Sequence, residues 1–442
     1  MKISLSDHFT YKKLMVFTLP SIAMMIFASI YGVVDGFFVS NFVNETAFTA
    51  VNFIFPFLMI LGAFGFMLGT GGCALIAKTM GEGDPKRANR LFSMVVYVSL
   101  GLGVLLAAVA FIFIRPIASW LGAEGQMLEY CVLYARINLI AMPALILQFE
   151  FQSFFVAAEK PNLGLWVTIA AGVTNMVLDA ILVGILPLGL TGAAIATATS
   201  QVVGGIVPLI YFARKNTSLL QLVRPELDGR ALVKVCTNGS SEFLSNVSMS
   251  LVSMLYNAQL MKYAGENGVA AYGVLMYVNF VFISYFIGYV VGTAPIVSYH
   301  YGAGNYDELK NLVKKSVVIV GVVSVLMLIM GETLAGPLSS LFVGYNKELF
   351  EMTHRGFLIY SFSFLFAGIS LFASSFFTAL NNGFLSALVS FLRTAVFQVA
   401  AVLILPIFFD IDGIWLSIVA AEVIAAAVAV IVLLSNRKRY HY

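Results

Sequence analysis

The stretch GTGGCALIAKTMGEGDPKRANR at residues 69–90 has a counterpart later in the chain, VGTAPIVSYHYGAGNYDELK at residues 291–310. Their glycines pair at a constant offset of 221 residues: Gly71 with Gly292, Gly81 with Gly302, and Gly83 with Gly304. Two further matches follow in the same order, QSFFVAAEKPN (152–162) with SSFFTALNNG (374–383), and the Leu-Pro and Gly of 186–192 with those of 405–413. Three matches in order at nearly one offset predict an internal repeat.

The composition is that of a membrane protein. Of the 442 residues, 60% are hydrophobic and 11% are charged, whereas a soluble domain has about 45–50% apolar and about 25% charged residues. This excludes an ordinary soluble enzyme, a disordered protein and a collagen-like fibre. The net charge of +3 is too small to indicate a nucleic-acid partner.

Twelve apolar stretches are long enough to cross a bilayer as helices. They lie at about 14–40, 46–77, 91–114, 131–157, 163–186, 190–212, 235–261, 269–299, 312–335, 355–380, 384–409 and 413–435. The first is too long for a signal-peptide core, and we expect it to be retained as a span. An even number of spans places both termini on one side of the membrane.

Lys and Arg residues are distributed unequally between the two sides that these spans define. If the amino terminus is cytoplasmic, 19 of the 25 basic residues fall on the inner side and five on or near the outer side. Because cytoplasmic loops carry the excess of Lys and Arg, we expect a multi-pass protein of the plasma (inner) membrane with both termini in the cytoplasm.

A repeat of six spans keeps the same membrane orientation in both copies, so the two halves are parallel. We predict an all-α integral membrane protein with twelve transmembrane helices in two pseudo-symmetric six-helix bundles. Residues 1–212 form the first bundle, 213–234 a polar cytoplasmic linker, and 235–442 the second bundle. Two such halves with a cleft between them are typical of secondary transporters.

The chain lacks the sequence motifs of an enzyme or of a cofactor-binding protein. It has no GxxxxGK[ST] phosphate loop, no HExxH and no GxSxG, and its four histidines lie at span ends or in tails. The three cysteines, Cys73, Cys131 and Cys236, form no CxxC pair, which is typical of small buried side chains rather than of a disulfide framework or a zinc site. We therefore expect no catalysis, no ATP-driven step and no cofactor.

Ionisable side chains inside the spans are costly and tend to be functional. The sequence places six there: Asp35, Glu150, Asp179, Glu242, Arg393 and Glu422. Five acids against one base indicate that the interior attracts cations. The 38 Phe and 18 Met residues would suit a cavity for flat lipophilic cations, although most must face lipid or other helices.

Four polar residues of the first half share one depth in the membrane. Asp35 and Asp179 lie about 8 Å and about 10 Å from the outer ends of their spans, at 1.5 Å per residue. Asn175 lies one turn deeper than Asp179 on the same helix face, and Thr197 is at a similar depth in the next span. The corresponding positions of the second half carry no acid, so we expect one cation-coupling site, in the first half.

This set of two carboxylates, an amide and a hydroxyl could hold a proton or a small hard cation. Two neighbouring carboxylates in a low dielectric cannot both ionise cheaply, so one retains a proton near neutral pH. The same oxygens could instead bind Na⁺, and Asp35 and Asp179 would then be metal ligands. The alternative is that these groups only fasten neighbouring helices by hydrogen bonds.

The other charged groups in the spans are candidate substrate or gating residues, each with an alternative. Glu242 follows Asn-Gly-Ser-Ser near the start of its span, where it could instead serve the helix N-terminus. Glu422 lies near the middle of the last span, and Glu150 could form a gate or pair with Arg393. Pro20 removes a backbone hydrogen bond in the first span and would either bend that helix during function or form a passive kink.

Several motifs resemble the multidrug and toxic compound extrusion (MATE) family over essentially the whole chain. They are Leu19-Pro20-Ser21, YGVVDGFFVS around Asp35, the Gly81-x-Gly83-Asp84 loop, and NMVLDAILVGILPLGLTGAAIATATSQ at 175–201. The similarity is closest to the branch that includes the DNA-damage-inducible F and MepA types. This resemblance implies the MATE fold, an N-lobe cation site at Asp35, Asn175, Asp179 and Thr197, and bending of the first helix at Pro20.

The resemblance also implies a secondary active multidrug efflux antiporter. Such a protein exports lipophilic, mainly cationic compounds in exchange for H⁺ or Na⁺ by alternating access, and we expect it to act as a monomer in the bilayer. A flippase for a lipid-linked saccharide would share the two-lobe fold, but its cleft should be cationic. A major-facilitator carrier should have GxxxD followed by basic residues between spans 2 and 3, whereas here Gly81 and Asp84 are three apart and Pro85 follows.

Overall fold

The computed structural model describes residues 3–442, and the side chains of all of these except those at positions 33, 35–37, 39–41, 45 and 48. The first half contains α1 (Tyr11–Phe42), α2 (Glu45–Gly81), α3 (Pro85–Trp120), α4 (Gly125–Ile140), α5 (Met142–Ala157), α6 (Pro161–Asp179), the π-helix η1 (Ala180–Ile185) and α7 (Gly189–Ala213). The second half contains α8 (Gly229–Gly302), α9 (Tyr306–Val343), α10 (Lys347–Tyr360), the 3₁₀ turn η2 (Ser361–Ser363), α11 (Phe364–Ala379), α12 (Gly383–Phe391), the π-helix η3 (Leu392–Phe397), α13 (Gln398–Ile404) and α14 (Pro406–Tyr440). Over the described residues there is no strand.

These helices supply twelve membrane crossings. Ten helical segments among the described residues are long and apolar enough to span a membrane, and the bent pair α4 and α5, joined at 60°, makes an eleventh. The twelfth comes from α8, whose 74 residues are interrupted at Gly265, where φ is 62° and ψ is −153°. Val235 and Tyr299, near the two ends of α8, both lie against α2, so the chain turns back at this glycine.

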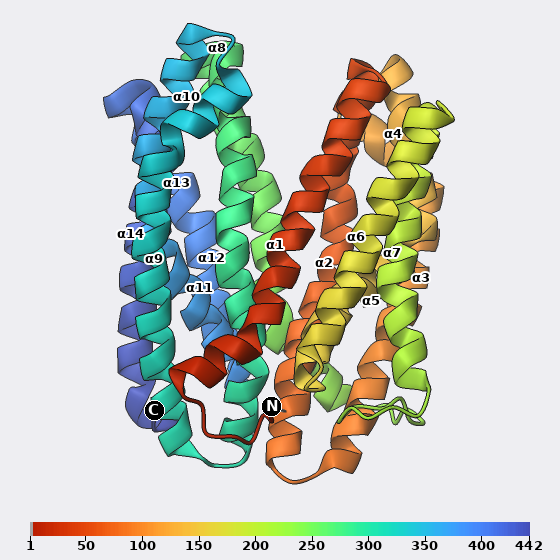
Figure 1. Ribbon diagram of the computed structural model, residues 1–442, viewed down its shortest axis with the longest axis vertical. Helices are drawn as coiled ribbons and strands as arrows, with labels where there is room; N and C mark the ends of the chain where they lie inside the picture. The colour runs from red at the N-terminus through yellow and green to blue at the C-terminus, as the bar shows by residue number, and fades with distance from the viewer. Residues whose placement is uncertain (1–2) are drawn as a thin grey trace.

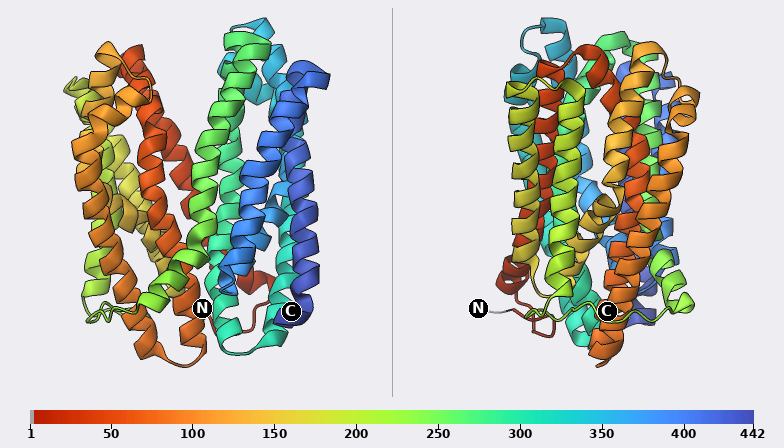
Figure 2. Two further views of the ribbon diagram at one scale, coloured as in Figure 1. Left: turned by 180° about the vertical axis from the view of Figure 1, so that it is seen from behind. Right: turned by 90° about the vertical axis from the view of Figure 1, so that its right-hand side faces the viewer.

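The helices form two bundles that lie side by side (Figure 1). Helices α1 to α7 make the first bundle and α8 to α14 the second, which confirms the predicted all-α fold in two halves. Both marked termini lie at one end of the molecule, here called the terminal end. The ribbons of the two bundles meet near this end and diverge toward the opposite, far end (Figures 1 and 2).

The bundles meet through glycines of α2 and α8 that touch backbone rather than side chains. A Cβ atom on Gly81 would lie 2.0 Å from the Tyr299 carbonyl oxygen, and one on Gly302 would lie 2.0 Å from the Lys78 carbonyl oxygen. Both pairs are related by the offset of 221 residues, so the same contact is made twice about a pseudo-two-fold axis. Only glycine, which has no Cβ, allows two helices to approach so closely.

The same pattern continues along α2 and α8. A Cβ on Gly71 would lie 2.0 Å from the Val235 carbonyl oxygen, and one on Gly239 would lie 1.8 Å from that of Met67. We call these contacts, at Gly71, Gly81, Gly239 and Gly302, the glycine seam.

The turns that follow the repeated glycines are also equivalent. Gly83 and Gly304 have φ angles of +85° and +67°, a left-handed backbone that glycine adopts without steric cost. Each lies two residues after the last residue of a helix that contributes to the glycine seam, α2 or α8. The repeat in the sequence therefore corresponds to a repeat in structure, with a turn of the same conformation in both halves.

We predict that Gly239→Ala loosens the glycine seam. The added methyl group cannot fit against the Met67 carbonyl without separating the helices, and overpacking of this kind costs about 1–3 kcal/mol. Thermal unfolding of the purified protein in detergent should show a lower midpoint. Gly101→Ala in α3 is the control, since a Cβ there meets no atom within 4 Å, and it should leave the midpoint unchanged or raise it. Equal unfolding midpoints for the two variants would contradict the claim that close packing at Gly239 stabilises the contact between α2 and α8.

Candidate functional site

The candidate site of the first bundle is built on one face of α6 that packs against α1. A Cβ on Gly172 would lie 2.6 Å from the Phe27 ring and 3.0 Å from the Tyr31 ring, so this face of α6 meets α1. Asn175 and Asp179 follow Gly172 at three and seven residues, which places them on the same face. Their side chains are only 2% and 0% exposed.

The register of α1 and α6 sets the level of Asp179. Both helices rise away from the terminal end (Figure 1), and Asp179 lies seven residues, or about 10 Å, beyond Gly172. That level corresponds to positions 34–38 of α1, which include the backbone of Asp35. The side chain of Asp35 lies outside the described residues.

Helix α7 brings Thr197 to the same level. A Cβ on Gly192 would lie 2.9 Å from the Leu182 carbonyl oxygen, and α7 runs antiparallel to α6. Thr197, five residues further along, is therefore level with position 177, between Asn175 and Asp179. Its hydroxyl donates to the Ala193 carbonyl at 3.0 Å, and the side chain is half-buried. The four helix positions of the predicted cation site thus share one layer, called here the N-bundle layer.

A π-helical segment adjoins this layer and was not foreseen from the sequence. Helix α6 ends at Asp179, and the π-helix η1 begins with the next residue, Ala180. Single π-turns within helices occur frequently at functional sites, because the wider turn changes how neighbouring side chains are presented. The irregularity therefore falls directly beside the carboxylate that the sequence singled out.

Two further buried amides of the same bundle, Gln148 and Gln152, were not predicted from the sequence. The Asn175 amide has no hydrogen-bond partner among the described residues, and the same holds for the Gln148 and Gln152 side-chain oxygens. Gln148 and Gln152 line a small cavity with Met24 and Thr168. Asn175 was predicted from the sequence, whereas Gln148 and Gln152 were overlooked, although a Gln within an apolar span is itself a detectable signal.

Glu150 is buried in the first bundle, away from any basic partner. Its side chain on α5 is 0% exposed and lies beside the Ser99 hydroxyl. Glu150 forms no ion pair within the described part of the chain, and Arg393 pairs with Glu422 in the second bundle instead. The alternative in which Glu150 pairs with Arg393 is therefore wrong.

The second bundle holds a buried ion pair. Arg393 Nη2 lies 2.8 Å from Glu422 Oε1, and Arg393 Nε donates to Glu422 Oε2 at 2.9 Å. The side chains are 13% and 4% exposed. Arg393 lies in the π-helix η3, so an irregular helix again adjoins a buried charge. Glu242 is half-buried and interacts electrostatically with Arg393.

The bend of the first helix lies against the second bundle. Pro20 is buried inside α1, which remains helical on both sides of it. A Cβ on Gly288 would lie 2.4 Å from Ile22 Cα, so α8 approaches the backbone of α1 at this point. Figure 1 shows α1 bent close to the terminal end. Because proline lacks an N–H, the turn of α1 that contains Pro20 has one backbone hydrogen bond fewer to break when the bend angle of the helix changes.

Among the residues whose side chains are described, no group of three His, Cys, Asp or Glu is arranged to hold a metal ion.

We predict that Arg393→Met strongly destabilises the fold. The variant leaves Glu422 buried without its partner, which costs about 3–5 kcal/mol, whereas replacing both members with apolar residues is close to neutral. Thermal unfolding should therefore show a large loss for Arg393→Met and recovery in the double variant with Glu422→Met. Arg115→Met is the matched control, since Arg115 and Glu129 form an exposed pair worth less than about 1 kcal/mol. A double variant as unstable as Arg393→Met would contradict this account of the pair.

Comparison with known proteins assigns the fold to a family. The MatE family model matches twice, at residues 20–181 and 243–404. Together the two matches cover more than half of the chain, and one lies in each of its two halves. The chain belongs to the MatE family.

Individual relatives agree over nearly the full length. The multidrug export protein MepA of Staphylococcus haemolyticus (strain JCSC1435) is 27% identical over 440 residues, which cover 97% of this chain and 94% of that protein. A crystal structure of MATE in complex with MaL6 superposes with a TM-score of 0.92 at 23% identity, covering 98% of this chain and 97% of the other. The outward-facing conformation of a multidrug resistance MATE family transporter of the MOP superfamily gives 0.91 at 23%, with the same coverage. The resemblance and the fold predicted from the sequence are confirmed.

Proposed function

We propose that this protein is a secondary active multidrug efflux antiporter, which exports lipophilic, mainly cationic compounds in exchange for H⁺ or Na⁺. The N-bundle layer carries the proposal, because a fully buried Asp179 shares a helix face with Asn175 at the level of Asp35. Membership of the MatE family and the name of the relative from S. haemolyticus, a multidrug export protein, support the same function.

The coupling chemistry follows from burial. A carboxylate in a low dielectric favours its neutral form or a bound cation. A proton taken up by the Asp35 and Asp179 pair neutralises one carboxylate and weakens the attraction for a cationic drug. Sodium would act through the same oxygens, with Asp35 and Asp179 as ligands and the Asn175 and Thr197 oxygens completing the set. Ion and drug then bind alternately.

Alternating access is the proposed mechanism, with the terminal end in the cytoplasm as the Lys and Arg distribution predicts. In this conformation the bundles meet at the terminal end and diverge toward the far end, which favours release of drug and uptake of the ion on the outer side. The bend at Pro20 would accompany the change of α1 between states. A coupling free energy of about 2–3 kcal/mol between ion and drug is sufficient for exchange.

The charged groups outside the layer take gating or substrate roles in this proposal. Glu150 and Glu242 remain acids without a complete partner, whereas the Arg393 charge is compensated by Glu422. A flippase for a lipid-linked saccharide would need free positive charge to meet pyrophosphate, and a compensated Arg393 does not supply it. We propose a monomer, since each chain contains both bundles.

We predict that Asp35→Asn and Asp179→Asn each lower coupled transport at least tenfold, because an amide cannot exchange a proton or carry the charge that binds Na⁺. Purified protein in liposomes is supplied with ethidium under an imposed pH gradient and, separately, a Na⁺ gradient. Glu226→Gln is the control: it removes a carboxylate that pairs with Arg90 near the linker, outside the spans.

Dependence of wild-type transport on one of the two gradients identifies the coupling ion. Full transport by both Asp variants would contradict the assignment of cation coupling to the N-bundle layer. Absence of ethidium transport by the wild type under either gradient would contradict drug export and favour the lipid-linked substrate.

A further inference from the structure

The segment that precedes α1 is tied to the first bundle at Glu159, which lies between α5 and α6. The Ser4 hydroxyl donates to Glu159 Oε1 at 2.6 Å, and the Leu5 N–H donates to the same oxygen at 2.8 Å. The Leu5 side chain is fully buried. This end of the segment is therefore held both by an anionic acceptor and by apolar packing.

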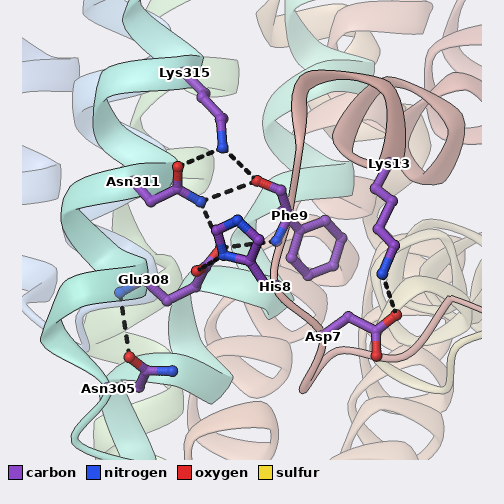
Figure 3. A network of polar contacts seen from close by, with 8 residues as sticks. All are labelled: Asp7, His8, Phe9, Lys13, Asn305, Glu308, Asn311 and Lys315. Atoms are coloured by element: carbon purple, nitrogen blue, oxygen red, sulfur yellow. Dashed lines mark hydrogen bonds and ion pairs between the residues drawn. The ribbon is translucent and has the colours of Figure 1, made fainter.

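Four residues later, the same segment is held by α9 of the second bundle (Figure 3). The Phe9 N–H donates to Glu308 Oε1 at 2.9 Å, while the Phe9 carbonyl accepts from Asn311 Nδ2 at 2.9 Å and from Lys315 Nζ at 2.7 Å. His8 Nδ1 contacts Glu308 Oε2 at 2.6 Å. α9 therefore holds both backbone groups of Phe9, while the fully buried Phe9 ring packs edge-on against Phe17 of α1 and His300 of α8.

The two anchors lie in different bundles, and the chain between them is short. An extended chain reaches at most about 3.5 Å per residue, so Leu5 and Phe9 can be no more than about 14 Å apart. A hydrogen bond of 3.1 Å from the Asp7 N–H to the Ser4 carbonyl folds the segment and shortens its reach further. The turn between α5 and α6 therefore cannot move far from α9 at the terminal end while both anchors hold.

We propose that residues 4–9 form a clasp that latches the two bundles at the terminal end, and that one anchor must be released before this end opens. The proposal rests on the alternating access proposed above. It assigns to this segment a conformational role that is separate from ion and drug binding.

The Glu159 anchor is the one that opens. There, two donors share a single oxygen of a half-buried side chain, whereas α9 contributes three side chains and Glu308 is only 5% exposed. Hydrogen bonds to a charged acceptor are stronger where water is excluded. Opening thus frees Ser4 and Leu5 from the first bundle and leaves Phe9 bound to α9.

The test measures the distance between bundles at the terminal end. Spin labels replace the exposed Lys86 and Lys438, in a background in which Cys73, Cys131 and Cys236 are changed to Ala. Distance distributions are then compared for the wild type, Glu159→Gly, Glu308→Ala and Glu226→Ala in lipid nanodiscs. Glycine is chosen at position 159 because its φ is +58°, and Glu226→Ala removes a terminal-end carboxylate that does not join the bundles.

We expect the population with the longer terminal-end distance to rise about tenfold in Glu159→Gly and in Glu308→Ala, since each variant removes hydrogen bonds to a charged group. Glu226→Ala should match the wild type. Wild-type distance distributions in both clasp variants would overturn the proposal. If transport is absent even in the wild type while the tenfold shift is present, the antiport proposal fails and the clasp is supported.

Hydrogen exchange of the unmodified protein provides a second measurement that needs no variant. Under conditions that populate the longer distance, the Leu5 amide should exchange faster than the Phe9 amide, because its anchor opens first. Equal protection of the two amides in that state would overturn the assignment of the opening anchor.

Discussion

Backbone contact between α2 and α8 at the glycine seam is the interaction on which the rest of the structure depends. In a bilayer, helices gain little from the hydrophobic effect when they associate, so close van der Waals packing has to supply the attraction. Glycine permits that packing, and at Gly81 and Gly302 the offset of 221 residues repeats it on both sides of the pseudo-two-fold axis. The seam joins the bundles at one end only, which leaves their far ends apart.

The two bundles share an architecture but differ in charge. In the first, Glu150 is buried and forms no ion pair among the described residues, and Asp179 is buried on the same helix face as Asn175. In the second, Arg393 forms an ion pair with Glu422, and Glu242 interacts electrostatically with the same arginine. A buried carboxylate outside any ion pair, such as Glu150, can exchange a proton or a cation, whereas a buried pair with good geometry resists it. The asymmetry is consistent with ion coupling in the first bundle and with a more structural second bundle.

Much of this organisation could be predicted from the sequence, because it depends on local periodicity and on the repeat. The spans, the two halves and the equivalent turns at Gly83 and Gly304 all follow from patterns within short windows. The pairing of Arg393 with Glu422, 29 residues away, could not be derived, since it depends on how helices pack. The π-helix that follows Asp179 and the one that contains Arg393 have no sequence signature of comparable strength. The clasp was missed because its two anchors, Glu159 and Glu308, are distant in sequence and only the fold brings them to one segment.

In the proposed mechanism, occupancy of the N-bundle layer determines which end of the molecule is open. This is tested most directly by the distance between bundles at the far end, with spin labels at the exposed Glu124 and Lys347. The distance is followed while pH and then Na⁺ concentration are varied, in otherwise unmodified protein and in Asp179→Asn. We expect one of the two ions to shift the far-end distance in the protein that retains Asp179 and to leave it unchanged in Asp179→Asn. The same shift in both proteins would contradict the account.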